Sequence, residues 1–311
     1  MMADKMATRK AYGETLVELG AENPDLVVMD ADLSKSTMTA EFGKKYPERF
    51  FNMGIAEQNL YGAAAGLALS GKVVCASTFA MFAAGRAFEI IRNSIGYTRA
   101  NVKICATHSG ITVGEDGASH QTFEDIALMR TIPGMTVINP SDGVSAGKLI
   151  RQAVAFNGPC YVRLGRAAVP VFYGEDSEIT LGKGNLIRDG RDVTVIATGI
   201  MVSEAAAAAE KLAEDGIDVR VIDMHTIKPL DEEIIIKAAE ETGAIVTAEE
   251  HSVIGGLGSA VAEVVVRNHP VKMSMVGQKD TYGESGKPDE LKKKYGMTSD
   301  DIIKAVKELI S

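Results

Sequence analysis

The segment DVTVIATGIMVSEAAAAAEKLAEDGIDVRVIDM, residues 192–224, decides the fold of this chain. It begins with a β-branched run at 192–198 and ends with another at 219–224, and an alanine-rich stretch at 202–215 lies between them. β-branched residues favour strands, whereas alanine, leucine, glutamate and lysine favour helices. A strand, a helix and a strand in this order are typical of parallel strands joined by a helix.

The same alternation extends in both directions from this segment. Towards the carboxyl end it predicts helices at 231–242 and 256–268, strands at 244–249 and 272–277, and two terminal helices. Towards the amino end it predicts strands at 26–29, 72–75, 102–106, 135–138 and 160–163, with helices at 8–20, 56–70, 82–97, 122–131 and 143–156. The charged, glycine-containing stretch 174–191 predicts a linker or a hairpin. We therefore expect an α/β fold of two domains, 1–180 and 181–311, each a mostly parallel sheet flanked by helices.

The composition is that of an ordinary globular protein. Of 311 residues, 46% are hydrophobic and 24% are charged, which suffices for a substantial core. The net charge of −9 argues against nucleic acid or an anionic membrane surface as a partner. Three cysteines without metal-ligand spacing indicate buried thiols in a reducing compartment. No apolar run reaches the roughly 18 residues that span a bilayer. Residues 1–10 are polar and lack a signal peptide, so we expect a cytoplasmic protein.

Glu57 is the first candidate for a catalytic residue. It follows Gly54-Ile55-Ala56 and opens a helix of small and apolar residues. A buried carboxyl group that stays neutral can donate a hydrogen bond or a proton to a bound base. The alternative is a surface carboxylate, which the helix dipole favours in a first turn.

Residues 106–121 form the segment with the richest chemistry, Ala-Thr-His-Ser-Gly-Ile-Thr-Val-Gly-Glu-Asp-Gly-Ala-Ser-His-Gln. It follows a predicted strand, and open α/β sheets bind ligands at strand ends. His108, Asp116 and His120 fall within it, and such groups suit acid–base work, metal binding or recognition of hydroxyls. We favour a ligand-binding loop over a polar loop with incidental histidines.

Two other segments are candidate ligand contacts. Phe79 and Phe82 follow the strand that ends near Cys75, and their rings could stack on a flat heterocycle or belong to a core helix. Gly255-Gly256 precedes a helix and predicts a tight turn whose free amide groups could hold an anion. His251 beside this turn is expected to be structural.

The sequence also lacks two phosphate-binding motifs. No Gly-Asp-Gly followed by an asparagine about one helix later is present, and that arrangement would fix a metal-bound diphosphate. A Gly-x-x-x-x-Gly-Lys-Ser/Thr loop is absent as well.

Together these segments resemble the carboxy-terminal half of transketolase. The matching blocks, in the order of the family, are Ala7 to Ala11, Ala31 to Ser36, Gly54 to Asn59, Ser77 to Phe82, Thr107 to Gln121 and Gly158 to Arg166. The second predicted domain resembles the carboxy-terminal domain of the family. The resemblance covers essentially the whole chain, and the loop 107–121 is its most specific part.

The resemblance implies a role for each candidate residue. Glu57 would bind N1′ of the aminopyrimidine of thiamine diphosphate and so activate the cofactor, which is the electron sink of the reaction. Phe79 and Phe82 would line the pyrimidine, and Asp32 and Arg86 are assigned to the same cofactor site. His120, a second catalytic candidate, and Asp116 would bind sugar hydroxyls. The positions that match the phosphate grip of the family are Arg9, Ser36, His108 and Arg166.

The chain departs from the family pattern in two respects. The family has an aromatic three residues beyond Phe82, where this chain has Gly85, so Arg86 or Phe88 is expected to fill that space. The half that binds the diphosphate and the metal is not found. We therefore predict no metal ligands in this chain and expect Mg²⁺ or Ca²⁺ on an amino-terminal transketolase subunit that shares the cofactor. The resemblance implies a two-plus-two heterotetramer, inactive as a single chain, that acts on phosphosugars.

Three other interpretations stay open. A β subunit of a 2-oxo acid dehydrogenase shares the two-domain layout and the catalytic glutamate, but the Gly-Glu-Asp-Gly-x-x-His loop favours a phosphosugar enzyme. A deoxyxylulose-phosphate synthase is similar but is normally one continuous chain. A regulatory or scaffold subunit would not need Glu57, His108, Asp116 and His120 at ligand-facing ends.

Overall fold

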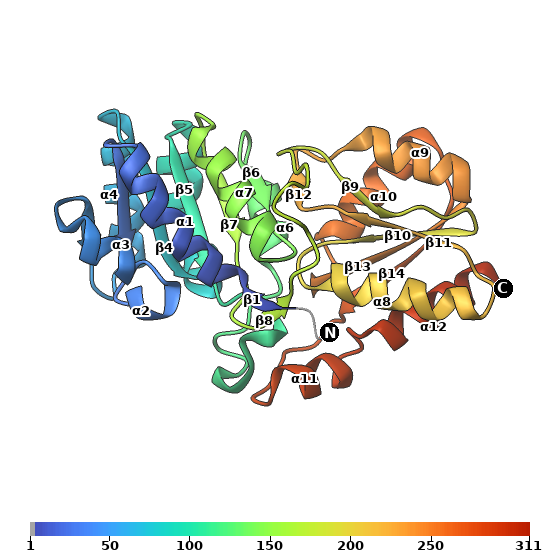
Figure 1. Cartoon of the computed structure of the whole chain (residues 1–311). Helices are drawn as coiled ribbons and strands as arrows, with labels where there is room; N and C mark the ends of the chain where they lie inside the picture. The colour runs from blue at the N-terminus through green and yellow to red at the C-terminus, as the bar shows by residue number, and fades with distance from the viewer. Residues whose placement is uncertain (1–3) are drawn as a thin grey trace.

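Seven strands form the sheet of the amino-terminal half of the chain (Figure 1). The computed structural model describes residues 4–311. The strand order is β12-β6-β7-β5-β4-β2-β3, and every pair is parallel except β12 with β6. The strands are β2 (Leu26–Asp30), β3 (Phe50–Asn52), β4 (Val73–Phe79), β5 (Val102–Thr107), β6 (Thr136–Ile138), β7 (Cys160–Arg163) and β12 (Thr226–Lys228). A separate antiparallel pair joins β1 (Lys5–Ala7) to β8 (Ala168–Pro170).

Helices cover both faces of this sheet and so bury its central strands on both sides. One face carries α1 (Thr8–Glu22), α3 (Ala40–Lys45) and α7 (Gly143–Ala155), with α2 (Ser34–Thr37) and η1 (Pro47–Arg49) nearby. The other face carries α4 (Glu57–Leu69) and α6 (Asp125–Arg130). The helix predicted at 82–97 is instead three short segments, η2 (Phe82–Arg86), α5 (Phe88–Ile90) and η3 (Ile91–Tyr97). η2 and η3 are π-helical, a geometry that local propensity does not reveal and that is frequent at functional sites.

The second sheet has the order β14-β13-β10-β11-β9, with β9 antiparallel to its neighbour. Its strands are β9 (Asn185–Arg188), β10 (Val193–Ala197), β11 (Val219–Asp223), β13 (Ala244–Ser252) and β14 (Lys272–Gln278). Its helices are α8 (Met201–Glu214), α9 (Glu232–Thr242), α10 (Leu257–Asn268), α11 (Pro288–Lys294) and α12 (Ser299–Ile310). The prediction from 192–224 of two parallel strands joined by a helix is confirmed. The stretch 174–191 is not only a linker, because β9 within it forms the edge of this sheet.

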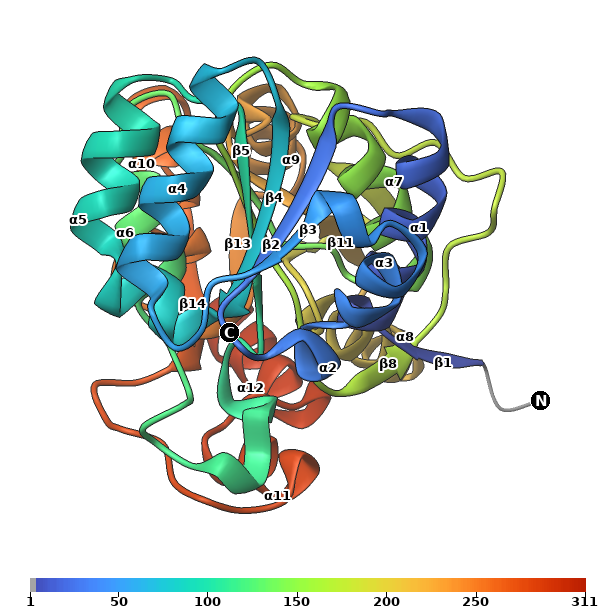
Figure 2. The same cartoon turned by 90° about the vertical axis from the view of Figure 1, so that its left-hand side faces the viewer.

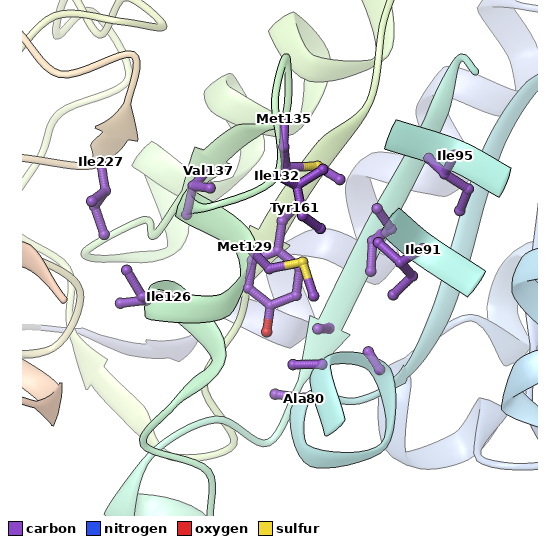
Figure 3. Close-up of a cluster of buried hydrophobic side chains, with 14 of the residues drawn as sticks. Ala80, Ile91, Ile95, Ile126, Met129, Ile132, Met135, Val137, Tyr161 and Ile227 are labelled. Carbon is purple, nitrogen blue, oxygen red and sulfur yellow. The ribbon is translucent and has the colours of Figure 1, made fainter. Parts of the chain in front are cut away.

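The two halves share one hydrophobic core. β12 lies at 226–228, inside the predicted second domain, yet it pairs with β6 of the first sheet. Figure 3 shows Ile227 of β12 on the same cluster of buried side chains as Val137, Ile126 and Tyr161. This cluster continues into α9 and α10. The halves therefore fold against each other over an apolar surface.

A buried carboxyl group lies where the two halves meet. Asp223, the last residue of β11, is 0% exposed. Its Oδ2 accepts hydrogen bonds from the Ser141 hydroxyl at 2.6 Å and from the Tyr173 hydroxyl at 3.0 Å. Burial raises the pKa of Asp223 to about 7, although both hydrogen bonds act to lower it.

Stability should therefore depend on the protonation of Asp223. The unfolded group ionises near pH 4, whereas the native group keeps its proton up to about pH 7. The native state holds an extra proton between these values, so its stability falls as the pH rises through that range. At 1.36 kcal/mol per pH unit, the wild type should lose about 3 kcal/mol relative to Asp223→Asn between about pH 5 and pH 8. Urea unfolding of both proteins at each pH measures this difference, and equal pH dependence would contradict it.

The loop 108–121 projects from the first half and lies beside α11 of the second half (Figures 1 and 2). It contains the turn η4 (Ile111–Asp116). Within residues 4–311, no helix is both long enough and apolar enough to span a bilayer.

Candidate active site

The candidate residues come from the carboxyl ends of neighbouring strands. β4 ends at Phe79, β5 ends at Thr107 just before His108, and β7 ends at Arg163, close to Arg166. β5 pairs with both β4 and β7, so these strand ends lie side by side. This is the edge at which open α/β sheets bind ligands.

Four aromatic rings pack together at this edge. The Phe79 ring stacks on the His108 imidazole at a centroid distance of 3.8 Å and on the Phe82 ring at 6.0 Å. The His120 imidazole stands edge-on to Phe79 and Phe82, at 6.2 and 5.4 Å. Such stacked and edge-to-face contacts hold rings in fixed orientations. Phe79 and His108 are buried, whereas Phe82 and His120 are partly exposed and can meet a ligand.

Glu57 lies at one end of this aromatic stack. It is the first residue of α4 and is only 2% exposed, so the alternative of a surface carboxylate is wrong. Arg86 Nη1 donates a hydrogen bond to Glu57 Oε2 at 3.1 Å. The same guanidinium lies over the Phe82 ring, 4.8 Å from its centroid, which is a cation–π contact. Of the two residues expected to compensate for Gly85, Arg86 lies over the Phe82 ring and Phe88 packs on the core; which of them fills the family's aromatic position stays a prediction.

Arg9 and Arg166, with His108 between them and the aromatic rings, form a cationic group at the other end of the stack. Arg9 Nη1 donates to the Ser36 carbonyl at 2.7 Å and lies 3.5 Å from His108 Nε2. Since a guanidinium can only donate, we assign the His108 proton to Nδ1, which lies 2.9 Å from the Thr107 hydroxyl. Burial, together with the nearby charges of Arg9 and Arg166, lowers the pKa of His108 to about 3. His108 is therefore neutral at pH 7.

The cationic group has features of an anion site. Burial and the repulsion from Arg166 lower the pKa of Arg9. Arg9 Nε is buried and has no hydrogen-bond partner within residues 4–311. An anion placed here would relieve the repulsion and satisfy the free donor, and guanidinium forks match the oxygens of a phosphate.

The loop 108–121 is fastened to Arg166. Arg166 Nη1 donates to the Val113 carbonyl and to Glu115 Oε2, each at 2.6 Å. The hydrogen bond from Arg166 lowers the pKa of the exposed Glu115 carboxyl. Asp116 is exposed beyond it, and the Ser119 hydroxyl lies 3.0 Å from His120 Nδ1. No signal in the sequence points to Glu115 as the carboxylate that holds Arg166, because the two residues are far apart in the chain.

The structure separates Asp32, which precedes α2, from Ser36, which lies within α2. The buried Asp30 carboxylate holds this segment by accepting bonds from Leu33 N, Thr37 Oγ1 and Thr39 Oγ1. That arrangement brings the Ser36 carbonyl to Arg9. The side chain of Asp32 is exposed and, among the described residues, bonds to Asn52 at 3.2 Å. Asp32 therefore lies outside the aromatic stack.

The expected anion site at Gly255-Gly256 is wrong. The amides of Leu257 and Gly258 donate to the two carboxylate oxygens of Glu249, at 2.7 and 2.8 Å. The Glu249 carboxylate thus occupies the amide groups at the start of α10 that an external anion would need. His251 is buried with Nδ1 at 2.7 Å from the Ser252 carbonyl, in agreement with a structural role.

Comparison with known families identifies both halves of the chain. Residues 4–171 match the pyrimidine-binding domain of transketolase, and residues 182–302 match the transketolase C-terminal domain. The chain belongs to the transketolase family. This confirms the resemblance and the two-domain α/β fold. The division at residue 180 stays a prediction.

Several members of the transketolase family have the same extent as this chain. A putative transketolase C-terminal section from Methanocaldococcus jannaschii is 54% identical over 303 residues, which cover 96% of this chain and 95% of that protein. A subunit of the apulose-4-phosphate transketolase of Phocaeicola vulgatus is 42% identical and covers 99% of both chains. A solved structure described as a split gene transketolase, inactive beta4 tetramer, is 54% identical with a TM-score of 0.92 and covers 98% of both chains.

The transketolase family depends on thiamine diphosphate, and the residues at the stack fit its aminopyrimidine. Glu57 offers a buried carboxyl group for a ring nitrogen, and the partly exposed Phe82 ring offers an aromatic face. A buried carboxyl group beside an aromatic face is typical of a heterocycle site.

Proposed function

We propose that this chain is the carboxy-terminal subunit of a split transketolase. In this proposal the enzyme transfers a two-carbon ketol unit from a ketose phosphate to an aldose phosphate. One observation supports it most: Glu57 and the cationic group of Arg9, His108 and Arg166 lie at opposite ends of one aromatic stack. Glu57, which would activate the cofactor, and the arginines that would bind the phosphate of the sugar therefore lie at the two ends of a single site.

The residues of this chain have distinct tasks in the proposal. Glu57 binds a ring nitrogen of the cofactor, and Phe79 and Phe82 line its pyrimidine. His120 and Asp116 bind sugar hydroxyls from the exposed side of the site. Arg9, His108 and Arg166 form the phosphate site, in which the two guanidinium groups supply the hydrogen bonds and His108 is neutral. Bound thiamine diphosphate supplies the electron sink for the two-carbon fragment.

A second polypeptide completes the proposed enzyme. Relatives of the same length are named as a C-terminal section and as one subunit of a transketolase, which supports a separate amino-terminal subunit with the diphosphate site and its Mg²⁺ or Ca²⁺. The similar structure described as an inactive beta4 tetramer supports self-association and a lack of activity without the partner. We expect a two-plus-two heterotetramer in the cytoplasm.

Reconstitution tests this proposal. The purified chain is mixed with the amino-terminal transketolase section, Mg²⁺ and thiamine diphosphate, and is given xylulose 5-phosphate with ribose 5-phosphate. Ketol transfer by the mixture, but by neither chain alone, is expected. Apulose 4-phosphate is a further substrate to try, because one relative is named as a subunit of an apulose-4-phosphate transketolase. Turnover of pyruvate or a branched 2-oxo acid in place of ketol transfer would contradict the proposal.

The phosphate grip gives a separate prediction. Arg166→Ala should raise the KM for phosphorylated sugars about tenfold or more, because a charge-assisted hydrogen bond is worth about 1.5–3 kcal/mol. The KM for the unphosphorylated sugars should change less. Glu115→Gln is the matched control, since it frees Arg166 from its carboxylate partner without removing the cation. An equal rise in KM for both kinds of sugar would show that Arg166 does not bind phosphate.

A further inference from the structure

The loop 108–121 has an attachment to the second half of the chain that its proposed role does not require. Glu250 lies on β13 and is 2% exposed. Its Oε1 accepts a hydrogen bond from the Thr112 amide at 2.6 Å. Thr112 stands near the start of η4, between His108 and the pair formed by Asp116 and His120. A carboxylate of the carboxy-terminal half thus holds the backbone of the loop at its base.

The backbone of the loop turns around this carboxylate. Gly110 has a φ of +75°, and a Cβ placed on it would lie 2.3 Å from the carboxyl carbon of Glu250. The carboxylate therefore occupies the space that any side chain at position 110 would need. A loop that fits this closely can take few other positions while the carboxylate is present.

Glu250 itself is held by the amino-terminal half. Arg163 Nη2 donates to the Glu250 carbonyl at 2.9 Å, and Arg163 Nε donates to Asp125 Oδ2 at 2.8 Å. All three residues are almost fully buried. The backbone of Glu250 is therefore fixed on one side and its carboxylate meets the loop on the other.

We propose that Glu250 is a positioning residue that sets the sugar-binding loop, so that the carboxy-terminal half takes part in substrate binding. This inference rests on the proposed function for its effect on sugars. Glu250 makes no contact with substrate in this role; it acts through the Thr112 amide and the turn at Gly110. Small errors in the placement of binding groups are costly, because a shift of about 1 Å can reduce a rate about 100-fold.

Glu249 provides a matched control on the same strand. It is as buried as Glu250, but its carboxylate bonds to the amides of Leu257 and Gly258 within the carboxy-terminal half. Adjacent strand residues point to opposite faces, which explains why the two carboxylates have different partners. A change at Glu249 should reduce stability without altering the loop 108–121.

Hydrogen–deuterium exchange of the single chain tests the structural part. Glu250→Ala should speed exchange in peptides covering 108–121 about tenfold or more, since the Thr112 amide loses its acceptor. Glu250→Gln keeps an acceptor oxygen and should restore most of the protection. Gly110→Ala displaces the carboxylate from the loop side and should also speed exchange, should Glu250→Ala not fold. The inference is overturned by unchanged exchange in the variants that fold, or by an equal increase in Glu249→Ala.

Kinetics of the chain reconstituted with its partner test the functional part. Glu250→Ala should raise the KM for the sugar phosphate about tenfold or more and leave the concentration of thiamine diphosphate for half-saturation unchanged. Glu250→Gln should restore the KM, and Glu249→Ala should alter neither value. An equal change in sugar and cofactor dependence would overturn the inference. Absence of ketol transfer by the wild-type mixture would refute the proposed function alone, because the exchange experiment does not depend on activity.

Discussion

Glu57→Gln should reduce the kcat of the reconstituted enzyme about 100- to 10,000-fold, the range that a positioned acid or base contributes. Glutamine has nearly the same shape, so the packing of α4 should persist. It cannot exchange a proton with a ring nitrogen as a carboxyl group does. The residue is 2% exposed, so a water molecule from bulk solvent cannot readily take over its task.

Folding and catalysis are separable at this position. Arg86, the ion-pair partner of Glu57, is 50% exposed and stays hydrated when the carboxylate is lost. The urea midpoint of Glu57→Gln should therefore lie close to that of the wild type. Glu89→Gln is the control, because Glu89 is exposed on the adjacent α5 and bonds to Asn93. Unchanged turnover in Glu57→Gln, or an equal loss in the control, would remove Glu57 from its proposed role.

Arg163→Met should lower the free energy of unfolding by about 3–5 kcal/mol, the usual effect of breaking a buried ion pair. Arg163 is 2% exposed and its partner Asp125 is 0% exposed. Burial acts to raise the pKa of Asp125, but the nearby charges of Arg163 and His251, together with the hydrogen bonds from Arg163 and Tyr161, lower it below its usual range. Without Arg163 a carboxylate would remain in the core and, among residues 4–311, would keep as polar neighbours the Tyr161 hydroxyl at 2.7 Å and His251.

Urea unfolding measures this loss. Arg151→Met is the matched control: Arg151 pairs with Glu18 and Glu22 on the surface, where such pairs contribute about 1 kcal/mol or less. The double variant Arg163→Met with Asp125→Leu should recover much of the stability, because it removes the unpaired charge as well. A loss in Arg163→Met as small as that of the control would contradict the importance of this buried pair.

The pattern of elements was largely predictable from the sequence because it depends on neighbours in the chain. The runs at 192–198 and 219–224 became β10 and β11, and the alanine-rich stretch became α8. The segment 82–97 was one exception, and the strands β9 and β12 were others. The apolar spacing of 82–97 is that of one helix, and no local rule indicates where π-helical turns interrupt it.

The candidate site was predictable only in part. The types of residue pointed to Glu57, the two phenylalanines and the histidines, and the structure brings most of them together. The sequence could not decide whether Glu57 is buried, because a glutamate in the first turn of a helix is consistent with both a buried catalytic carboxyl group and a surface carboxylate. Nor could it show that the Glu249 carboxylate accepts hydrogen bonds from the amides of Leu257 and Gly258, or that the Glu250 carboxylate accepts one from the Thr112 amide. Those contacts depend on which loops meet in three dimensions, and no periodicity encodes them.

The strand β12 has a consequence for how the chain can be divided. It supplies the last strand of a sheet whose other six strands come from residues 26–163. A fragment cut at residue 180 would keep β6 and β7 but lose β12, and the amides and carbonyls on the β12 side of β6 would then form an open sheet edge. Open edges of this kind recruit strands from other molecules. The separately expressed first half should therefore aggregate through β6, although its own helices and strands are complete.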